Sequence, residues 1–400
     1  MYNAQLAEEH VLTLDLMRKH LFPFLLDHDM YKRSQTSKEM YKMYGLKEYV
    51  VNSDEKLQSI PNGTTHLIVK QFNKTIEKNL IPPSVLHIDF GWRFNTKLGH
   101  GVLPGGLQSV VFGNTFNQPL NVGVLPDTLQ KLALGQEFRE HIVFPRNLRH
   151  LKLSTSLNTL SSLESENRFR HNLKKLEHVT HLTIEHLGEF TEVVDFNLNT
   201  LPQSLTHLIV DFVHDEHYDK FNLVNIRGDY PTTLIDLTLG ESFDAPFTVS
   251  NLPDSLTHLR FGDAFDRPLT KLRDGITYLS FGKYFDHDLS GVLPNTLKYL
   301  RLGQRFNQSL GKGVLPKGLQ TLVISTKFYE DLYEDDGEGE RKELYKPEYD
   351  TMSTIQTYVP RLEVLYVCYE CEDNYILADP APWPDCEHCQ YTPWADCEHC

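Results

Sequence analysis

Residues 252–265, LPDSLTHLRFGDAF, contain the unit that decides the fold, because the same pattern recurs along most of the chain. Near copies are LPGGLQSVVFGNTF at 103–116 and LPNTLKYLRLGQRF at 293–306. Repetition at such a period is typical of solenoids and propellers, so the period, rather than the length, determines the architecture. Taking the Leu-Pro position as the start, we place units at Ile60, Ile81, Leu103, Leu125, Phe144, Lys175, Leu201, Tyr230, Leu252, Leu272, Leu293 and Leu315.

Two columns of each unit predict a short strand. The residue seven after each start is always aliphatic, and the residue two further on is again apolar. Apolar residues two apart put both side chains on one face of a strand. A Gly commonly follows, and we interpret it as the residue that ends the strand and lets the chain turn. The aliphatic column is Leu67, Ile88, Val110, Leu132, Leu151, Leu182, Leu208, Leu237, Leu259, Leu279, Leu300 and Leu322.

A Phe recurs three residues after the Gly position, and Asn or Asp usually follows it. This Phe is too regular to be a binding residue, so we interpret it as a stacked aromatic spine of the core. One unit cannot bury its apolar stripe alone, but stacked units bury the stripes and pair the strands into a parallel sheet. With about 4.8 Å between strands, the array should be roughly 50 to 60 Å long. The Phe column is Phe94, Phe116, Phe138, Phe243, Phe265, Phe285, Phe306 and Phe328.

Composition and motifs exclude several functional classes. The chain has 400 residues, 40% of them hydrophobic, and 39 basic against 54 acidic residues give a net charge of −15. This charge argues against nucleic acid as a partner, since phosphates need a Lys/Arg footprint. There is no apolar run long enough for a membrane span and no secretory signal, so we expect a cytoplasmic protein. No nucleotide-binding, hydrolase or metalloprotease motif occurs, and we expect no enzymatic activity.

The repeated pattern, Leu-Pro-x-Ser-Leu-x-x-Leu-x-Phe-Gly-x-x-Phe-Asn/Asp-x-Pro-Leu, resembles the FNIP repeat. This relative of the leucine-rich repeat is abundant in social amoebae and in giant DNA viruses of amoebae, and a viral source would place the protein in the host cytoplasm. The resemblance covers 59–328 and is weak over 154–229, where the array is either kinked or split into two lobes. It implies an α/β-type repeat solenoid, a leucine-rich-repeat-like stack with short parallel strands, that binds a protein target.

The amino-terminal segment, 8–50, has no repeat and keeps an amphipathic helical spacing that Pro23 interrupts. Its order of residues resembles a divergent F-box, a helical motif that docks on the adaptor subunit of a cullin-RING ubiquitin ligase. The resemblance implies a substrate receptor, whose repeats would choose the target. The alternative is a helical cap on a solenoid scaffold with no link to ubiquitin. The adaptor contacts implied are Leu21, Phe22, Pro23, Phe24 and Leu25.

The column six residues after each start is rich in imidazole and phenol rings. If the register is right, these side chains line the concave face about 5 Å apart. A metal site needs three or four ligands converging on one ion, whereas a ladder of rings diverges. The column is therefore either a recognition surface or solvated sheet. It contains His66, His87, His150, His181, His207, His258, Tyr278 and Tyr299, of which His207, His258, Tyr278 and Tyr299 are the predicted target contacts.

After the array, 329–358 reads as an acidic loop, and 359–400 as a half-repeat followed by a cysteine-rich tail. The tail contains three C-x-x-C pairs, two of them in a tandem duplication. Two such pairs present four thiolates to Zn²⁺, so structural zinc is one interpretation, and an idle flexible tail is the other. We expect no other cofactor. The six cysteines are Cys368, Cys371, Cys386, Cys389, Cys397 and Cys400.

Overall fold

The structure is a computed structural model. It describes residues 48–52, 54–70, 72–155, 173–187, 194–213, 224–325, 333–335, 341–343, 358–360, 362–367 and 376–378. The F-box-like residues Leu21, Phe22, Pro23, Phe24 and Leu25 and all six cysteines lie outside these ranges, as does most of the acidic loop.

Short strands dominate the described residues. The strands are β1 (Glu48–Val51), β2 (His66–Val69), β3 (His87–Asp89), β4 (Ser109–Val111), β5 (Lys131–Leu134), β6 (His150–Thr155), β7 (His181–Leu187), β8 (Val194–Asn197), β9 (His207–Val213), β10 (Val224–Arg227), β11 (Asp236–Leu239), β12 (His258–Phe261), β13 (Tyr278–Ser280), β14 (Tyr299–Arg301), β15 (Thr321–Ser325), β16 (Tyr333–Asp335), β17 (Arg341–Glu343), β18 (Glu363–Val367) and β19 (Ile376–Ala378). The helical elements are α3 (Asp54–Gln58) and the 3-10 turns η3 (Leu198–Thr200) and η4 (Val249–Asn251).

Fifteen of these strands form one sheet, in the order β1-β2-β3-β4-β5-β6-β7-β9-β11-β12-β13-β14-β15-β18-β19. Every neighbouring pair is parallel except the last, β18 with β19. The predicted aliphatic column is one register row, in which Leu67 pairs with Ile88 and the row continues to Leu322. The prediction of stacked units with parallel strands is therefore confirmed.

The main sheet continues without interruption through the region where the repeat is weak. There β6, β7, β9 and β11 pair directly, each with the next. The inserted strands β8 and β10 leave the sheet and pair with each other in a separate parallel ribbon. Longer connections thus lengthen the turns while the strand stacking is kept.

The α/β label is not confirmed for the part of the chain that the structure describes. The α-helix that lies wholly within it, α3, has five residues, and the described segments between consecutive strands consist mainly of turns, extended chain and the 3-10 turns η3 and η4. The described fold is a parallel-strand β-solenoid. The predicted helical segment 8–50 lies almost wholly outside the description, and its last three residues form part of β1 instead of a helix.

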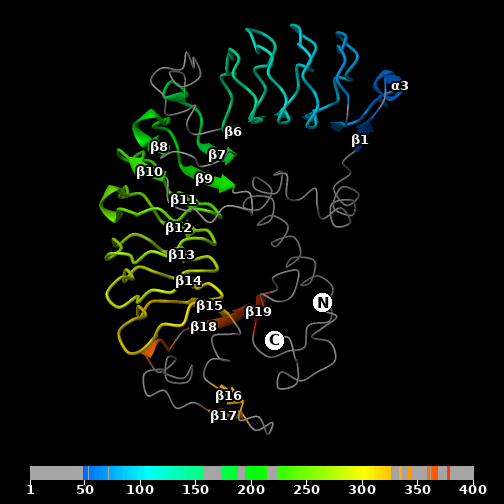
Figure 1. The fold of residues 1–400 in the computed structure, drawn as a ribbon. Helices are drawn as coiled ribbons and strands as arrows, with labels where there is room; N and C mark the ends of the chain where they lie inside the picture. The colour runs from blue at the N-terminus through cyan, green and yellow to red at the C-terminus, as the bar shows by residue number, and fades with distance from the viewer. Residues whose placement is uncertain are drawn as a thin grey trace, which may run out of the picture.

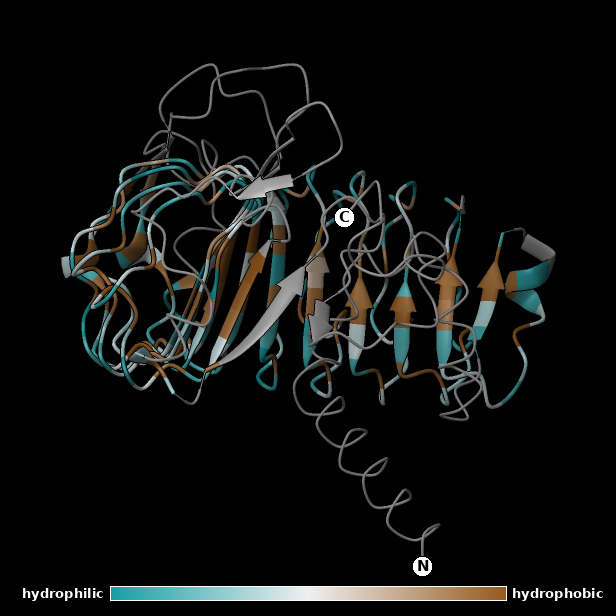
Figure 2. Cartoon of the chain, turned by 90° about the horizontal axis from the view of Figure 1, so that it is seen from below, coloured by the Kyte–Doolittle hydropathy of each residue, from teal (hydrophilic) through white to brown (hydrophobic). Residues whose placement is uncertain are grey.

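The solenoid follows a curved path, and the strands of its main sheet lie toward the inner side of the curve, whereas β8 and β10 lie on the outer side (Figure 1). Seen from below, the strands run side by side in one direction, and several of them begin in hydrophilic residues (Figure 2). The sheet therefore forms the concave face. The side chains at each strand's first position point away from the core, because the aliphatic column directly after them is buried.

The core is built from stacked phenylalanines, as predicted. Phe94, Phe116 and Phe138 stack at centroid separations of 6.0 and 6.1 Å with nearly parallel rings. Phe265 and Phe285 stack in the same way at 6.1 Å. All five are buried, and each ring contributes about 1.5–3 kcal/mol by leaving water.

The glycine column has a cause that the sequence pattern did not reveal. Gly91 has a left-handed φ of +61°, but Gly113 and Gly262 do not. A Cβ on Gly113 would clash with the carbonyl oxygen of Gly91, and one on Gly262 would clash with that of Gly240. Consecutive turns therefore approach each other so closely at this column that only a hydrogen fits. The glycine is required by stacking, more than by freedom to turn.

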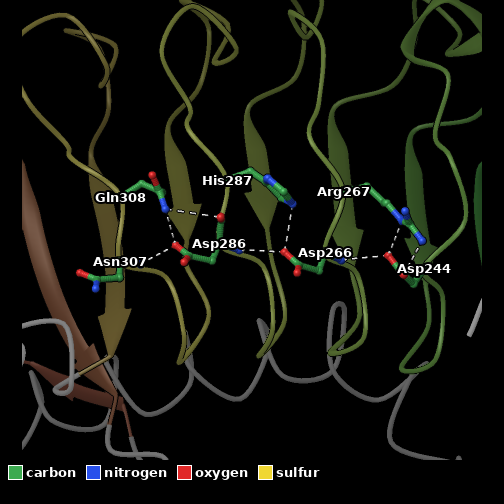
Figure 3. A network of polar contacts seen from close by, with 7 residues as sticks. All are labelled: Asp244, Asp266, Arg267, Asp286, His287, Asn307 and Gln308. Carbon is green, nitrogen blue, oxygen red and sulfur yellow. Dashed lines mark hydrogen bonds and ion pairs between the residues drawn. The ribbon is translucent and has the colours of Figure 1, made fainter. Parts of the chain in front are cut away.

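A ladder of Asn and Asp side chains follows the Phe column and joins consecutive turns. The backbone N–H of Asn117 donates to Oδ1 of Asn95 at 2.9 Å, and that of Asp266 donates to Oδ1 of Asp244 at 3.1 Å. Figure 3 shows the carboxyl-terminal part of the ladder, where each acceptor also receives a side chain from the next turn. Each rung pairs a backbone N–H that lies outside the sheet, which is the requirement for burying such a group.

Candidate functional site

The first residues of the strands form one continuous row across the concave sheet, which we call the strand-start row. Each member pairs in register with the member on the next strand. Nearly all are partly exposed, so the row presents side-chain edges to solvent. From β2 to β15 it runs His66, His87, Ser109, Lys131, His150, His181, His207, Asp236, His258, Tyr278, Tyr299 and Thr321.

The rings of the row stack on one another along the sheet. His181 lies 4.1 Å from both His150 and His207, measured between ring centroids, and its ring is nearly parallel to that of His207. Tyr278 and Tyr299 stack at 4.4 Å with an interplanar angle of 3°. Because the ring faces cover each other, the row offers ring edges, with their nitrogen and hydroxyl groups, to a partner.

A threonine before several of these histidines holds the ring. The Oγ1 of Thr180 lies 2.9 Å from Nδ1 of His181, and the same contact joins Thr206 to His207 at 2.9 Å. Thr257 and His258 repeat it at 2.8 Å. One nitrogen of each ring is therefore engaged with the chain's own hydroxyl, which fixes the orientation of the ring.

The imidazoles are neutral at ordinary pH. Burial, with smaller contributions from Lys131 and His207, lowers the pKa of His150 to about 4. Burial together with neighbouring imidazoles and Lys131 lowers the pKa of His181 to about 3. Desolvation also lowers the pKa of His207, where Asp236 acts in the opposite direction. The strand-start row is thus a line of uncharged polar rings.

One ion pair interrupts the rings. Asp236, on β11, accepts two hydrogen bonds from one guanidinium nitrogen of Arg260, at 2.6 and 2.7 Å. The guanidinium lies over the ring of Tyr278, 4.6 Å from its centroid. Despite desolvation, its interactions with Asp236 and Tyr278 raise the pKa of Arg260. Charge at this point is neutralised within the face itself.

The structure brings the four predicted target contacts into this single row. His258, Tyr278 and Tyr299 lie on adjacent strands, with His258 and Tyr278 5.3 Å apart. His207 is separated from them by Asp236. Asp236 and Lys131 occupy the same column six residues after a unit start, but neither carries a ring, so the pattern of rings does not single them out.

Two other observations bear on possible sites. Within the described ranges, no group of three or more His, Cys, Asp or Glu side chains is placed to hold a metal ion. The cysteines of the tail lie outside those ranges, so the zinc prediction remains a prediction. Every helix in the described part of the chain is too short or too polar to cross a membrane.

The repeated unit also matches a known family profile. The FNIP Repeat profile matches residues 55–92, 94–137, 225–264 and 265–305. The chain contains FNIP repeats. These FNIP segments flank the region of β6 to β9, where the connections are long and the pattern is weak, and they include the Asn and Asp ladders of both halves.

Two known proteins are similar to parts of this FNIP-containing chain. A calmodulin-binding protein, CmbB of Dictyostelium discoideum, is 41% identical over 78 residues, which are 20% of this chain and 19% of that protein. The crystal structure of CroV588, described as a novel circular LRR protein, has a TM-score of 0.48 at 33% identity. That match covers 67% of this chain and 41% of the solved chain. The chain therefore spans about a fifth of the curated relative and less than half of the solved protein.

Proposed function

We propose that this protein is a protein–protein interaction module that holds a partner protein along the strand-start row of its concave sheet. The observation that carries the proposal is the row of partly exposed rings in register, which run from His150 to His207 and, beyond Asp236, from His258 to Tyr299. Repeat solenoids present extended concave surfaces that are used for binding. Aromatic residues and arginine are enriched at protein interfaces; this row contains tyrosines, and Arg260 lies over the ring of Tyr278.

The rigidity of the row supports this function. Each ring is held by stacking on its neighbours, and several are also held by a threonine hydroxyl. A partner that binds such a surface does not have to order it first, so less free energy is lost on association. The contacts we propose are His207, His258, Tyr278 and Tyr299.

The experiment is site-specific crosslinking. A photoreactive amino acid at Tyr299 should capture a discrete partner from native cells, whereas the same group at Val122 should not. Val122 is 77% exposed and lies in a turn between β4 and β5, outside the strands of the sheet. Equal capture from both positions, or capture from neither, would contradict the proposal.

We further propose that the module is the substrate receptor of a cullin-RING ubiquitin ligase. Residues Leu21 to Leu25, in the F-box-like order, support this role, with the repeats choosing the target. Affinity purification with the ligase adaptor tests it, and Phe22→Ala with Phe24→Ala should abolish recovery of the adaptor. If the adaptor is not recovered with the intact chain, the amino-terminal segment is a cap on a scaffold instead.

The relative's name supplies a second candidate partner. CmbB is a calmodulin-binding protein, so calmodulin is a partner to test for this chain. We expect retention on immobilised calmodulin. Comparison with and without Ca²⁺ separates specific binding from adsorption, because only the former depends on the conformation of calmodulin.

A further inference from the structure

The geometry of the threonine contacts favours one of the two histidine nitrogens as the one that carries the proton. In each case the nearby backbone carbonyl already accepts two N–H groups: that of Thr180 accepts from Thr206 at 2.9 Å and from His207 at 3.0 Å. The hydroxyl of Thr206 lies 3.1 Å from the carbonyl oxygen of Thr180 and 2.9 Å from Nδ1 of His207. A hydroxyl has one proton, and the nearer acceptor with an unused lone pair is the ring nitrogen. The proton of the neutral ring is then on Nε2.

The same arrangement recurs at two other positions. The carbonyl of Arg149 accepts the N–H groups of Thr180 and His181, and that of Ile235 accepts those of Thr257 and His258. In both places the hydroxyl is at least 0.4 Å closer to Nδ1 (2.9 and 2.8 Å) than to the carbonyl (3.4 and 3.3 Å). Three histidines of the row therefore share one tautomer.

The outward ring edges are consequently hydrogen-bond donors. Within the described residues, Nε2 of His181, of His207 and of His258 has no hydrogen-bond partner, and none of these atoms is buried. Lys131, on the strand before His150, adds an ammonium group that has no ion pair in the described part of the chain. From Lys131 to His207 this donor line crosses three strand spacings, about 14 Å, the reach of four or five extended residues.

The carboxylates beside the donor line are already used. Glu185 accepts from Lys152 at 2.6 Å and from Ser154 at 2.7 Å, and Asp236 is paired with Arg260. Although the whole chain has a net charge of −15, this part of the face has spare donors and engaged acceptors. A basic ligand would therefore bind to carboxylates elsewhere on the surface of this acidic chain. The donor line fits a ligand that supplies acceptors.

From these contacts we propose that the donor line, Lys131, His181 and His207, binds an extended carboxylate-rich segment of the partner protein. The inference rests on the proposed function, since it assigns the chemistry of the partner at the same row. Carboxylates accept from N–H donors and from ammonium at once, and such charge-assisted bonds are the stronger class. Adjacent imidazoles supply one donor per strand along the segment.

The test uses the full chain and a fluorescent 12-residue oligoglutamate, with oligolysine of equal length as the control peptide. The donor-deletion variant is H181F/H207F, which keeps stacked rings, as the Phe columns of the core already do, and removes both Nε2–H groups. We expect oligoglutamate affinity to fall at least tenfold in this variant, with unchanged circular dichroism. No binding to the intact chain, or equal binding by the variant, would overturn the proposal. Preference for oligolysine would also overturn it.

Two further measurements make the outcome specific. The ¹⁵N chemical shifts of the histidine rings report the tautomer directly, and protonation of Nδ1 instead of Nε2 in His181 and His207 would overturn the assignment of the donors. A 12-nucleotide single-stranded DNA distinguishes the ligand class: binding as tight as that of oligoglutamate would point to polyanions in general and against an acidic protein segment. Crosslinking from Tyr299 is independent of these results, so a captured partner without oligoglutamate binding would leave the proposed function standing.

Discussion

The two halves of the solenoid use different side chains to join consecutive turns. In the amino-terminal turns, Asn73 and Asn95 accept the backbone N–H of the next turn, at 2.8 and 2.9 Å. In the carboxyl-terminal turns, Asp244, Asp266 and Asp286 take the same place, at 3.1, 3.2 and 2.8 Å. The backbone geometry is therefore shared, while the acceptor is neutral in one half and ionisable in the other. The position after the Phe therefore requires a side-chain oxygen as acceptor, and either an amide or a carboxylate can supply it.

The difference appears in the residue that follows each rung. In the half with Asp, this residue reaches back to the previous carboxylate: Arg267 donates to Asp244 through two nitrogens, each at 3.0 Å, and His287 lies 3.1 Å from Asp266. In the half with Asn, the corresponding residue is the uncharged Gln118, which donates to Asn95 at 3.1 Å. A charged rung thus has a partner on the next turn, as Figure 3 shows.

The largest effect should come from a column that the two halves share. Gly113→Ala in the first half and Gly262→Ala in the second would each press a methyl group against the backbone of the previous turn. Since the backbone of a stacked turn cannot move aside locally, we expect a loss of about 3–5 kcal/mol in the free energy of unfolding for each. Chemical denaturation followed by circular dichroism measures it.

Gly105→Ala is the matched control, because no atom lies within 4 Å of the Cβ it would add. It should change the free energy of unfolding by less than about 0.5 kcal/mol. If Gly113→Ala were as mild as Gly105→Ala, the close approach of the turns would be wrong.

The next effect in size is a pH dependence that should distinguish the halves. His87, His150 and His181 lie on β3, β6 and β7, and burial is the main cause that lowers their pKa values, to about 4, about 4 and about 3. The neighbouring charges that also lower them are the other histidines of the row and Lys131. In the unfolded chain the pKa of histidine is near 6.5. Between that pH and the lowered pKa values, the rings stay neutral in the folded state, whereas the unfolded chain takes up protons.

The free energy of unfolding therefore decreases as the pH falls from about 6.5 to about 4, and these histidines cause no pH dependence above pH 7. After discounting for solvent access to the ring edges, we expect a loss of about 2–3 kcal/mol over this window. Amide hydrogen exchange should show it first in β3 to β9 and last in β13 to β15, where Tyr278, Tyr299 and Thr321 occupy the row. His181→Phe should flatten the dependence, and an unchanged slope in that variant would contradict this origin.

Much of the fold could be predicted from the sequence because stacking imposes a strict period. The aliphatic and Phe columns follow from the need to bury one stripe per turn, and the sequence alone locates both by residue number. The column of rings was found for the same reason, since a side chain at a fixed distance from the unit start lies on a fixed face. Its members His207, His258, Tyr278 and Tyr299 do share the row.

Other features depend on contacts between turns, which a single unit does not contain. Gly113 looks like a turn residue until the carbonyl of Gly91 is placed against it. Asp236 and Lys131 gain their roles from neighbours on adjacent strands, and the Asn or Asp after each Phe looks like a loop residue until the next turn's N–H is aligned with it. The connections in each turn follow no helical period, so the α/β label was drawn from resemblance alone.

The smallest effects test the ladder itself. Asn95→Ala removes the acceptor for the N–H of Asn117, and we expect a loss of about 1 kcal/mol in the free energy of unfolding. Asp244→Ala removes the acceptor for the N–H of Asp266 and also leaves Arg267 without its carboxylate, so we expect about 2 kcal/mol. The shift of the denaturation midpoint measures both losses, provided that the slope of the free energy against denaturant concentration is unchanged. Equal losses in the two halves would mean that the charged rung gains nothing from its arginine.

Exchanging the two acceptors separates the backbone bond from the ion pair. Asp244→Asn keeps an oxygen for the N–H of Asp266 but loses the charge facing Arg267, and since 37% of that arginine side chain is exposed, the pair is screened by water. We expect a loss of about 0.5 kcal/mol, reduced further by 0.5 M salt. Asn95→Asp should be near neutral, because the two groups that donate to this position, the N–H of Asn117 and the amide of Gln118, can donate to a carboxylate equally well. If Asp244→Asn cost as much as Asp244→Ala, the carboxylate charge, and not its oxygen, would hold the turns of the second half together.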